Sequence, residues 1–187
     1  MFYNEFMNKT ALIIVGGFAG AGKTTVAIRL SSEHKYPVFS SDTINDALRE
    51  GLKKSFKEVS PTAYEVMWRL VRQQLGLGIT VIADVHMAAA HTWENLDKLK
   101  EEMPDILILP IILQATIDTH RTRIEERGLT NKEHLNLGGD KLEDVLFKYE
   151  YIESLDRPDL IRVDANGGFE DVYSAVKKVI TENLQLN

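Results

Sequence analysis

Residues 16–25 read GGFAGAGKTT and stand between the apolar run ALIIV and the segment VAIRL. The run is typical of a buried strand, and the later segment continues as an amphipathic helix. Gly17, Gly22, Lys23 and Thr24 match the pattern G-x-x-x-x-G-K-[ST]. Glycines in such a turn let backbone N–H groups converge on an anion at the amino end of a helix. The stretch therefore predicts a phosphate-binding turn between a strand and a helix.

Outward from this turn, apolar runs alternate with amphipathic segments along the chain. Strands are predicted near residues 11–16, 37–40, 79–84, 106–114 and 159–163. Their continuous β-branched content is typical of parallel strands that are covered on both faces. The alternation predicts one α/β domain over residues 1–187, with a three-layer sandwich around a five-stranded parallel sheet.

Capping signals predict where two of the helices begin. Ser60 is expected to cap one helix, with Pro61 at its first position, and Asp140 with Glu143 is expected to form a capping box for another. Apolar spacing predicts a last helix near the carboxyl end of the chain. Pro110 lies inside a predicted strand and lacks a backbone donor, so we expect a late strand start or a bulge there.

Composition limits the classes of function. The chain has no cysteine, which excludes disulfides, thiolate metal sites and cysteine nucleophiles. A net charge of −6 argues against a broad nucleic-acid footprint. The first residues lack the features of a secretory signal, and the apolar runs are too short to span a bilayer. We expect a cytoplasmic protein without membrane contact, and the sequence leaves its oligomeric state open.

The glycine turn resembles that of the P-loop nucleoside triphosphate-binding superfamily. The resemblance implies the P-loop fold, here with strand order 2-3-1-4-5, and it implies ATP and Mg²⁺ as ligands. The residues that would hold the nucleotide phosphates are Gly17, Gly20, Ala21, Gly22, Lys23, Thr24 and Thr25. Thr24 would bind Mg²⁺ directly, and Asp84, after the third strand, would orient it through water. An ordinary turn aspartate is the alternative role for Asp84.

Asp42 follows the second strand, where a carboxylate could orient an acceptor hydroxyl or take its proton. Capping of the next helix is the alternative role. The string SSDT, residues 40–43, resembles small-molecule kinases related to chloramphenicol phosphotransferase, the zeta toxins and the polynucleotide kinase 5′-hydroxyl domain. In those families the aspartate acts on the acceptor. Their pattern often has an arginine a few residues later, whereas Asn45 and Asp46 follow here, so the substrate class stays open.

Arg123 and Arg127 lie four residues apart in residues 116–128, TIDTHRTRIEERG, and so share one helical face. Like charges at this spacing repel each other unless an anion lies between them. The spacing resembles the lid entrance of nucleoside monophosphate kinases and gluconate kinases. This implies that Arg123 holds nucleotide, that Arg127 neutralises charge in the transition state, and that a lid covers approximately residues 121–140. A solvated charged face and a plain surface loop are the alternatives.

Residues after the third and fifth strands give weaker signals. His86 and His91 are expected to be solvated or to line the substrate site rather than to bind a metal, and they are candidates for shaping the acceptor pocket. Residues 164–168, DANGG, are best explained as a turn. The string NKEH, residues 131–134, does not match the N-K-x-D pattern that reads guanine, which favours ATP over GTP.

These features favour an ATP-dependent kinase that phosphorylates a hydroxyl group of a small molecule. The residues expected to act in the reaction are Lys23, Asp42, Arg123 and Arg127. Two alternatives remain. A P-loop ATPase or nucleotide-dependent regulator would hydrolyse ATP without a second substrate, and a nucleic-acid 5′-hydroxyl kinase would need a basic channel. Only Lys53, Lys54 and Lys57 hint at such a channel.

Overall fold

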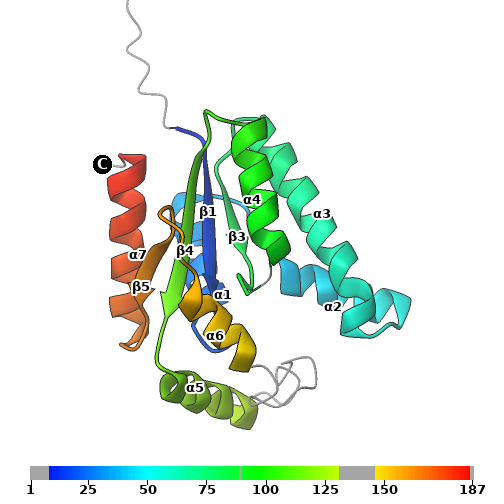
Figure 1. Cartoon of the computed structure of the whole chain (residues 1–187), viewed down its shortest axis with the longest axis vertical. Helices are drawn as coiled ribbons and strands as arrows, with labels where there is room; N and C mark the ends of the chain where they lie inside the picture. Colours follow the sequence, from blue (N-terminus) through cyan, green and yellow to red (C-terminus); the bar gives the residue numbers. More distant parts are fainter. Residues whose placement is uncertain (1–8, 89, 131–145, 186–187) are drawn as a thin grey trace, which may run out of the picture.

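We analysed a computed structural model of the chain, which describes residues 9–88, 90–130 and 146–185, with the backbone alone at 127–130. A five-stranded parallel sheet has the order β2-β3-β1-β4-β5, as predicted (Figure 1). Its strands are β1 (Ala11–Gly17), β2 (Val38–Ser40), β3 (Val81–Asp84), β4 (Leu107–Gln114) and β5 (Ile161–Asp164). The helices are α1 (Lys23–His34), α2 (Ser41–Leu52), α3 (Phe56–Gly76), α4 (Ala90–Glu102), α5 (Ile117–Thr130), α6 (Leu146–Ser154) and α7 (Phe169–Leu184).

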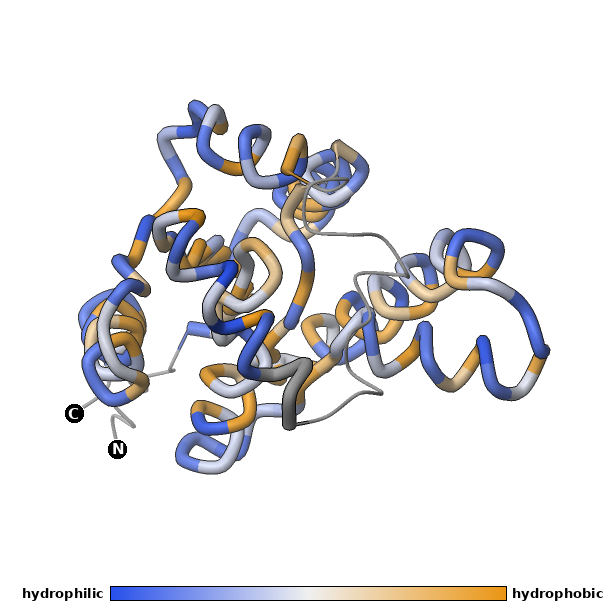
Figure 2. The backbone as a smooth tube through the Cα atoms, turned by 90° about the horizontal axis from the view of Figure 1, so that it is seen from below, coloured by the Kyte–Doolittle hydropathy of each residue, from blue (hydrophilic) through white to orange (hydrophobic). Residues whose placement is uncertain are grey.

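Strand β1 is buried along its whole length and separates two apolar clusters. Ile13 and Val15 pack in the cluster that includes side chains of α1 and α7, whereas Leu12 and Ile14 pack in the cluster that includes side chains of α3 and α4. Hydrophilic and hydrophobic residues alternate along the turns of the helices (Figure 2). Helices thus cover both faces of the sheet, which gives the predicted three layers.

Helix α3 begins earlier than predicted. Its N-cap is Ser55, and Glu58 completes a capping box because its carboxylate accepts hydrogen bonds from the Ser55 backbone N–H at 3.0 Å and from the Ser55 hydroxyl at 2.7 Å. The prediction that Ser60 caps this helix was therefore wrong, and Pro61 lies inside the helix instead of at its first position. The reciprocal cap satisfies the free N–H groups of the helix end before the proline is reached.

Pro110 causes neither a bulge nor a late strand start, so that prediction was also wrong. The Leu107 N–H donates to Thr10 O at 3.0 Å on the β1 side, and Gln114 O accepts from Ala165 N at 2.7 Å on the β5 side. Since backbone groups alternate between the two neighbours of a parallel strand, Pro110 directs its nitrogen toward β5. Strand β5 pairs with β4 only from Ile111 onward, so no partner at Pro110 requires the missing donor.

The two later helix predictions have different outcomes. Helix α7 confirms the predicted last helix. The predicted capping box at Asp140 and Glu143 lies outside the described residues, and α6 is described from Leu146. Among the described residues, no helix combines the length and apolar character that crossing a membrane requires.

The strands all end at one edge of the sheet, near α5 and α6 (Figure 1). The glycine turn follows β1 there, α2 follows β2, and Asp84 ends β3. The fold therefore gathers the predicted site residues from distant parts of the sequence.

Candidate active site

The glycine turn between β1 and α1 has the backbone of an anion site. Gly17, Gly20 and Gly22 have positive φ angles of 138°, 76° and 90°. A Cβ atom at Gly17 would lie 2.6 Å from Leu113 O, which no side chain tolerates without movement of the backbone. The Ala21 N–H donates to Phe18 O at 3.2 Å and closes the turn. Only glycine fits this tight path beside β4.

The amino end of α1 is open to a ligand. Its N-cap, Gly22, forms no side-chain cap, and no acidic residue lies in its first turn. Backbone N–H groups at a helix start attract anions, and the helix dipole adds to this attraction. Thr25 is exposed in the same turn of the helix. Phosphate oxygens would accept hydrogen bonds from the N–H groups at this helix end, and no protein carboxylate would have to move away first.

Lys23 and Thr24 extend the site toward the neighbouring strand. The Lys23 ammonium donates to Phe18 O at 3.0 Å and so lies over the glycine turn. The Thr24 hydroxyl donates to Asp84 Oδ2 at 2.7 Å. Asp84 itself is only 3% exposed. Mg²⁺ prefers oxygen ligands and commonly binds through one or two protein oxygens together with phosphates and water. The Thr24 and Asp84 pair fits this pattern.

Asp42 lies in the first turn of α2 but does not cap that helix, since the N-cap is Ser40. Its carboxyl is accessible from solvent, yet protein atoms crowd it. Desolvation raises the pKa of Asp42; Lys23 acts in the opposite direction, and Asp84 raises it further. Asp42, Lys23 and Asp84 therefore lie near one another at one edge of the sheet. A carboxylate with a raised pKa accepts a proton more readily than an ordinary aspartate.

Tyr64 and Ser41 join this group, although the sequence analysis missed both. Burial raises the pKa of the Tyr64 hydroxyl, and hydrogen bonds to the Ser41 side chain and the His86 backbone lower it. Ser41 is 1% exposed. Its only sequence signal is its place directly before Asp42, whereas nothing in the spacing of α3 distinguishes Tyr64 from its neighbours.

Two buried imidazoles lie beside the glycine turn. Burial lowers the pKa of His86 to about 3, and the charges of Lys23 and Lys148 act in the same direction. Burial likewise lowers the pKa of His120 to about 4. Both rings are therefore neutral at neutral pH. The Phe18 ring meets both edge-on, with centroid distances of 6.1 Å to His86 and 5.2 Å to His120.

Aromatic packing continues below the turn. The ring of Tyr149, from α6, lies 5.7 Å from the rings of both Phe18 and His120. His120, from α5, was also missed by the sequence analysis, because nothing local indicates that its ring is buried against Phe18. The glycine turn thus rests on aromatic side chains from three segments.

Arg123 reaches across to the loop after β5. Its guanidinium donates to Gly167 O at 2.8 Å, and a Cβ atom at Gly20 would lie 3.6 Å from Arg123 Cβ. Arg123 is therefore near the glycine turn, as its predicted role requires. The backbone of Arg127 belongs to α5, but its side chain is outside the described residues, as are residues 131–140 of the predicted lid. The joint role of the arginines stays a prediction.

Residues 164–168 form a turn that also supports α5. Asn166 Oδ1 accepts hydrogen bonds from Thr116 N at 2.8 Å and from the Thr119 hydroxyl at 3.0 Å. Asp164 in turn accepts a hydrogen bond from the Asn166 side chain at 2.7 Å. The loop that holds Arg123 is thus fixed to the start of the helix that carries it.

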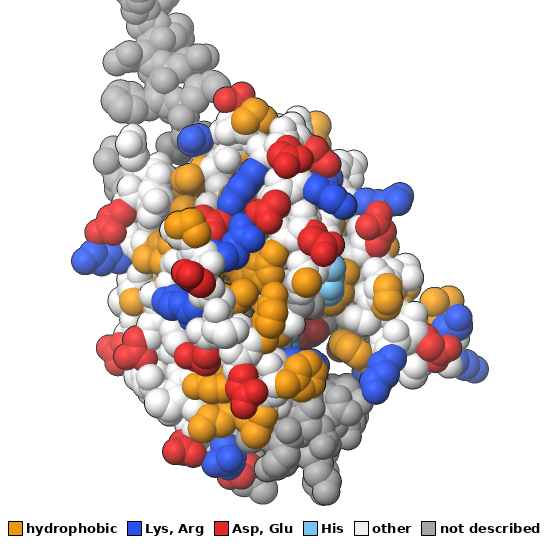
Figure 3. Space-filling model, in the orientation of Figure 1, with side chains coloured by type: hydrophobic (Ala, Val, Ile, Leu, Met, Phe, Trp, Pro, Cys, Tyr) orange, Lys and Arg blue, Asp and Glu red, His pale blue; other side chains and the backbone are white. Residues whose placement is uncertain are grey.

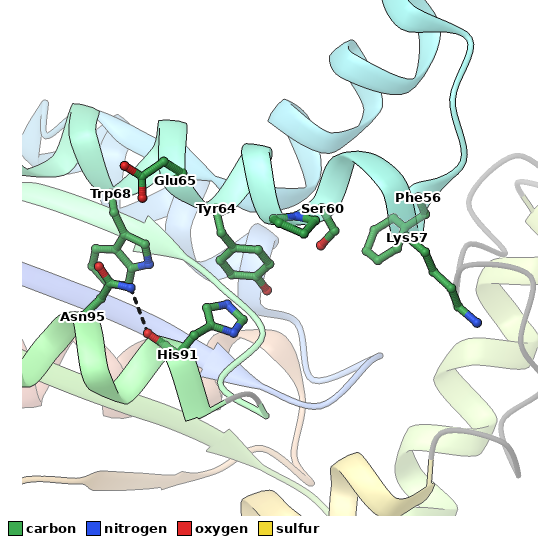
Figure 4. A pocket seen from close by; sticks show the side chains of 9 residues that line it. Phe56, Lys57, Ser60, Tyr64, Glu65, Trp68, His91 and Asn95 are labelled. Carbon is green, nitrogen blue, oxygen red and sulfur yellow. Dashed lines mark hydrogen bonds between the residues drawn. The ribbon is translucent and has the colours of Figure 1, made fainter.

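A cavity of about 590 Å³ lies between α3 and α4 (Figure 4). The residues that line it are Phe56, Lys57, Ser60, Pro61, Tyr64, Glu65, Trp68, His91 and Asn95. The His91 ring meets Tyr64 edge-on at a centroid distance of 4.6 Å. In the space-filling view, hydrophobic side chains surround a histidine on this face (Figure 3). His91 lines this cavity, whereas His86 lies deeper, beside Phe18.

Comparison with known proteins agrees with this architecture. The model of the AAA domain family matches residues 12–152, which include the glycine turn, Asp42, Asp84 and Arg123. The chain belongs to the AAA domain family. This AAA domain is a P-loop, nucleotide-binding domain. No curated protein matches its sequence.

Solved structures resemble the AAA domain over almost its whole length. A candidate kinase from Chloroflexus aurantiacus is 23% identical, with a TM-score of 0.73 and coverage of 96% of this chain and 98% of the other. A sugar kinase from Janibacter has 16% identity, a TM-score of 0.63, and coverage of 92% and 93%. A gluconokinase from Sinorhizobium meliloti has 16% identity, a TM-score of 0.54, and coverage of 95% and 97%. At these identities the similarity shows the fold.

Proposed function

We propose that this AAA domain is a kinase that transfers the γ-phosphate of ATP to a hydroxyl group of a small molecule. The observation that carries the proposal is the position of Asp42 beside the glycine turn, where burial and the charge of Asp84 raise its pKa and the charge of Lys23 lowers it. A proton acceptor thus stands beside the phosphate-binding turn. The kinases with similar structures support the same class of reaction.

Different residues of the chain would bind the nucleotide, hold the cation and orient the transferring group. The N–H groups at the start of α1 and the Lys23 ammonium would hold the triphosphate, with Thr25 beside its inner part. Mg²⁺, held by Thr24 directly and by Asp84 through water, would supply positive charge to the phosphate oxygens. Arg123 would hold nucleotide from its place at the glycine turn, and Arg127 would neutralise the transferring group.

In the transfer step, the acceptor hydroxyl oxygen forms a bond to the γ-phosphorus. The bond from that phosphorus to the β–γ bridging oxygen breaks, and its electron pair leaves with ADP. Asp42 accepts the hydroxyl proton. Most catalysis of phosphoryl transfer comes from positioning and charge stabilisation, which is the work assigned here to backbone amides and cations.

The two alternatives differ in the acceptor. An ATPase or nucleotide-dependent regulator would use water, and a nucleic-acid kinase would use a 5′-hydroxyl group. Acidic and basic side chains are interspersed over the face seen in Figure 3, and Lys53, Lys54 and Lys57 are exposed at the junction of α2 and α3. Mixed charge of this kind favours a small acceptor over a polyanionic strand.

The test is a screen of ATP consumption by the purified protein against sugars, polyols, nucleosides, aromatic alcohols and oligonucleotides. We expect acceptor-dependent ADP release that the Lys23→Ala variant lacks. Calorimetry of Mg²⁺–ATP binding should give measurable affinity in the parent protein and a large loss in Lys23→Ala. Steady hydrolysis at the same rate with every acceptor and with none would contradict the kinase proposal and favour an ATPase.

A further inference from the structure

We propose that the cavity between α3 and α4 binds the acceptor, and that this acceptor is an alcohol carrying an aromatic ring rather than a sugar or other polyol. The proposal rests on the proposed kinase function and names its substrate class. The cavity volume of about 590 Å³ is that of a small-molecule site.

The walls of the cavity are mainly aromatic and apolar. Phe56, Pro61, Tyr64 and Trp68 all come from α3 and present their rings to the cavity. His91, at the start of α4, lies against Tyr64 from the opposite side (Figure 4). Aromatic side chains favour stacked or edge-to-face contact with another ring. A flat ring that enters between α3 and α4 would therefore find partners on both sides.

The polar side chains of the cavity lie mostly at its exposed margin or are already engaged. The Asn95 amide nitrogen already donates to His91 O at 2.9 Å, and its oxygen accepts from Arg72 at 3.3 Å. Lys57 and Glu65 are exposed. A sugar or polyol carries a hydroxyl on nearly every carbon, and each buried hydroxyl needs a partner. The side chains of the α3 wall are mostly rings, which offer few such partners, so this wall suits a ring better than a polyol.

One buried donor stands out on the cavity wall. Trp68 is 1% exposed, and its indole nitrogen has no hydrogen-bond partner among the described residues. An unpaired buried donor costs free energy, which a ligand oxygen could recover. Trp68 lies next to Asn95 and Tyr64 in the close view (Figure 4). The cavity thus suits a ring that carries one acceptor oxygen in addition to the reacting hydroxyl.

Tyr64 connects the cavity to the reaction centre. Its ring lines the cavity, while its hydroxyl bonds to the Ser41 side chain and the His86 backbone. Ser41 directly precedes Asp42 at the start of α2. An alcohol with its ring in the cavity can direct a hydroxyl group past Tyr64 toward the Asp42 carboxyl. The cavity that binds the ring and the site of phosphoryl transfer then lie next to each other.

Tryptophan fluorescence tests binding without any need for turnover. Trp68 and Trp93 are the two tryptophans of the chain, so the full-length Trp93→Phe variant reports on Trp68 alone. We expect 1-phenylethane-1,2-diol to change this fluorescence in a saturable way. Ethane-1,2-diol, which lacks the ring, should bind at least about tenfold more weakly because it buries no aromatic surface.

A matched pair of variants locates the site. In the Trp93→Phe background, Ser60→Phe places a ring inside the cavity, whereas Thr62→Phe places one on the exposed side of the same helix. We expect Ser60→Phe to weaken 1-phenylethane-1,2-diol binding at least about tenfold and Thr62→Phe to leave it unchanged. Both variants should bind Mg²⁺–ATP like their parent, which shows that they fold.

The outcomes separate this proposal from the kinase proposal. Equal binding of the two diols, or equal affinity of the Ser60→Phe and Thr62→Phe variants, would overturn the aromatic acceptor site even if the protein phosphorylates polyols. Selective binding of the phenyl diol at the cavity, without phosphorylation of any alcohol, would support the site as an aromatic pocket and overturn the kinase function instead.

Discussion

Asp84 ends β3 and Asp42 lies just after the neighbouring strand β2, but the two have different surroundings. Asp84 is buried and accepts a hydrogen bond from Thr24, which suits a residue that orients a cation. Asp42 is open to solvent at the start of α2, and its raised pKa suits a residue that receives a proton. The two carboxylates thus differ in burial, partners and neighbouring charge, which suits them to separate roles.

Asp42→Asn should reduce the rate of phosphoryl transfer by about 10²- to 10⁴-fold, because the amide cannot accept the proton. Its affinity for Mg²⁺–ATP should stay close to that of the parent. The measurements are turnover with the best acceptor from the screen and calorimetry with ATP. Glu50→Gln, an exposed change on the same helix, is the control. A similar loss of rate in both variants would argue against a specific role for Asp42.

The parent enzyme should also gain activity as the pH rises through the pKa of Asp42, since only the deprotonated carboxylate is a base. Because that pKa is raised, the gain should come above the ordinary value of 3.8. A rate profile that is flat from pH 4 upward would contradict this.

Gly17→Ala should disturb the glycine turn, because its φ of 138° is strained for alanine and the new Cβ atom would lie 2.6 Å from Leu113 O. We expect the free energy of unfolding to fall by about 1 to 3 kcal/mol and ATP affinity to fall with it. Gly51→Ala is the control, since a Cβ atom there meets nothing within 4 Å. Chemical denaturation and calorimetry measure the two effects, and equal behaviour of the two variants would contradict the prediction.

At the scale of elements, helix α3 starts with the Ser55 and Glu58 capping box. Ser55→Ala should lower the free energy of unfolding by about 1 kcal/mol, because it leaves helix N–H groups without a partner. Ser60→Ala, inside the helix, should change it by less than about half of that. Urea denaturation of both variants gives the comparison. A larger loss at Ser60 would place the helix start where the sequence analysis expected it.

The elements show where local sequence is informative and where it is not. The strands were predicted to within about two residues, because runs such as ILILPIIL leave few other choices. The start of α3 was missed, since Pro61 gave a strong but misleading signal beside a true capping pattern at Ser55. Helix starts depend on which of several nearby caps the tertiary structure uses.

The residues of the candidate site likewise differ in whether the local sequence could predict them. Gly17 to Thr25 lie in one continuous motif, so the sequence could identify them together. Tyr64, His120 and Trp68 acquire their roles through contacts with residues far away in the chain, which no local pattern encodes.

At the scale of the whole molecule, ion pairs fasten α4 to the segment before β5, away from the glycine turn. Arg157 contacts Asp97 at 2.6 Å and Asp159 at 3.1 Å, and Lys100 also pairs with Asp159. The Arg157 guanidinium lies 4.7 Å from the centre of the Trp93 ring. This cluster holds α4 against the segment before β5, on a side of the fold that strand pairing does not connect.

Asp159→Asn should lower the free energy of unfolding at pH 7 by about 1 to 2 kcal/mol. Burial raises the pKa of Asp159, but hydrogen bonds from Arg157 and Lys100 outweigh it and hold that pKa at about 2. The stabilisation is therefore complete above the ordinary pKa of 3.8 and is lost as the pH falls toward 2. Thermal unfolding from pH 2 to 7 measures it, with Asp156→Asn as the exposed control. A difference between parent and variant that does not shrink at low pH would contradict the assignment.

Pro110 has a consequence for how far the sheet extends within this molecule. Its nitrogen faces the side of β4 on which β5 pairs only from Ile111 onward, and its side chain is buried. A residue without a backbone N–H cannot continue a ladder of hydrogen bonds on that side. The ladder between β4 and β5 therefore cannot be lengthened past Ile111 without leaving a buried carbonyl without its donor.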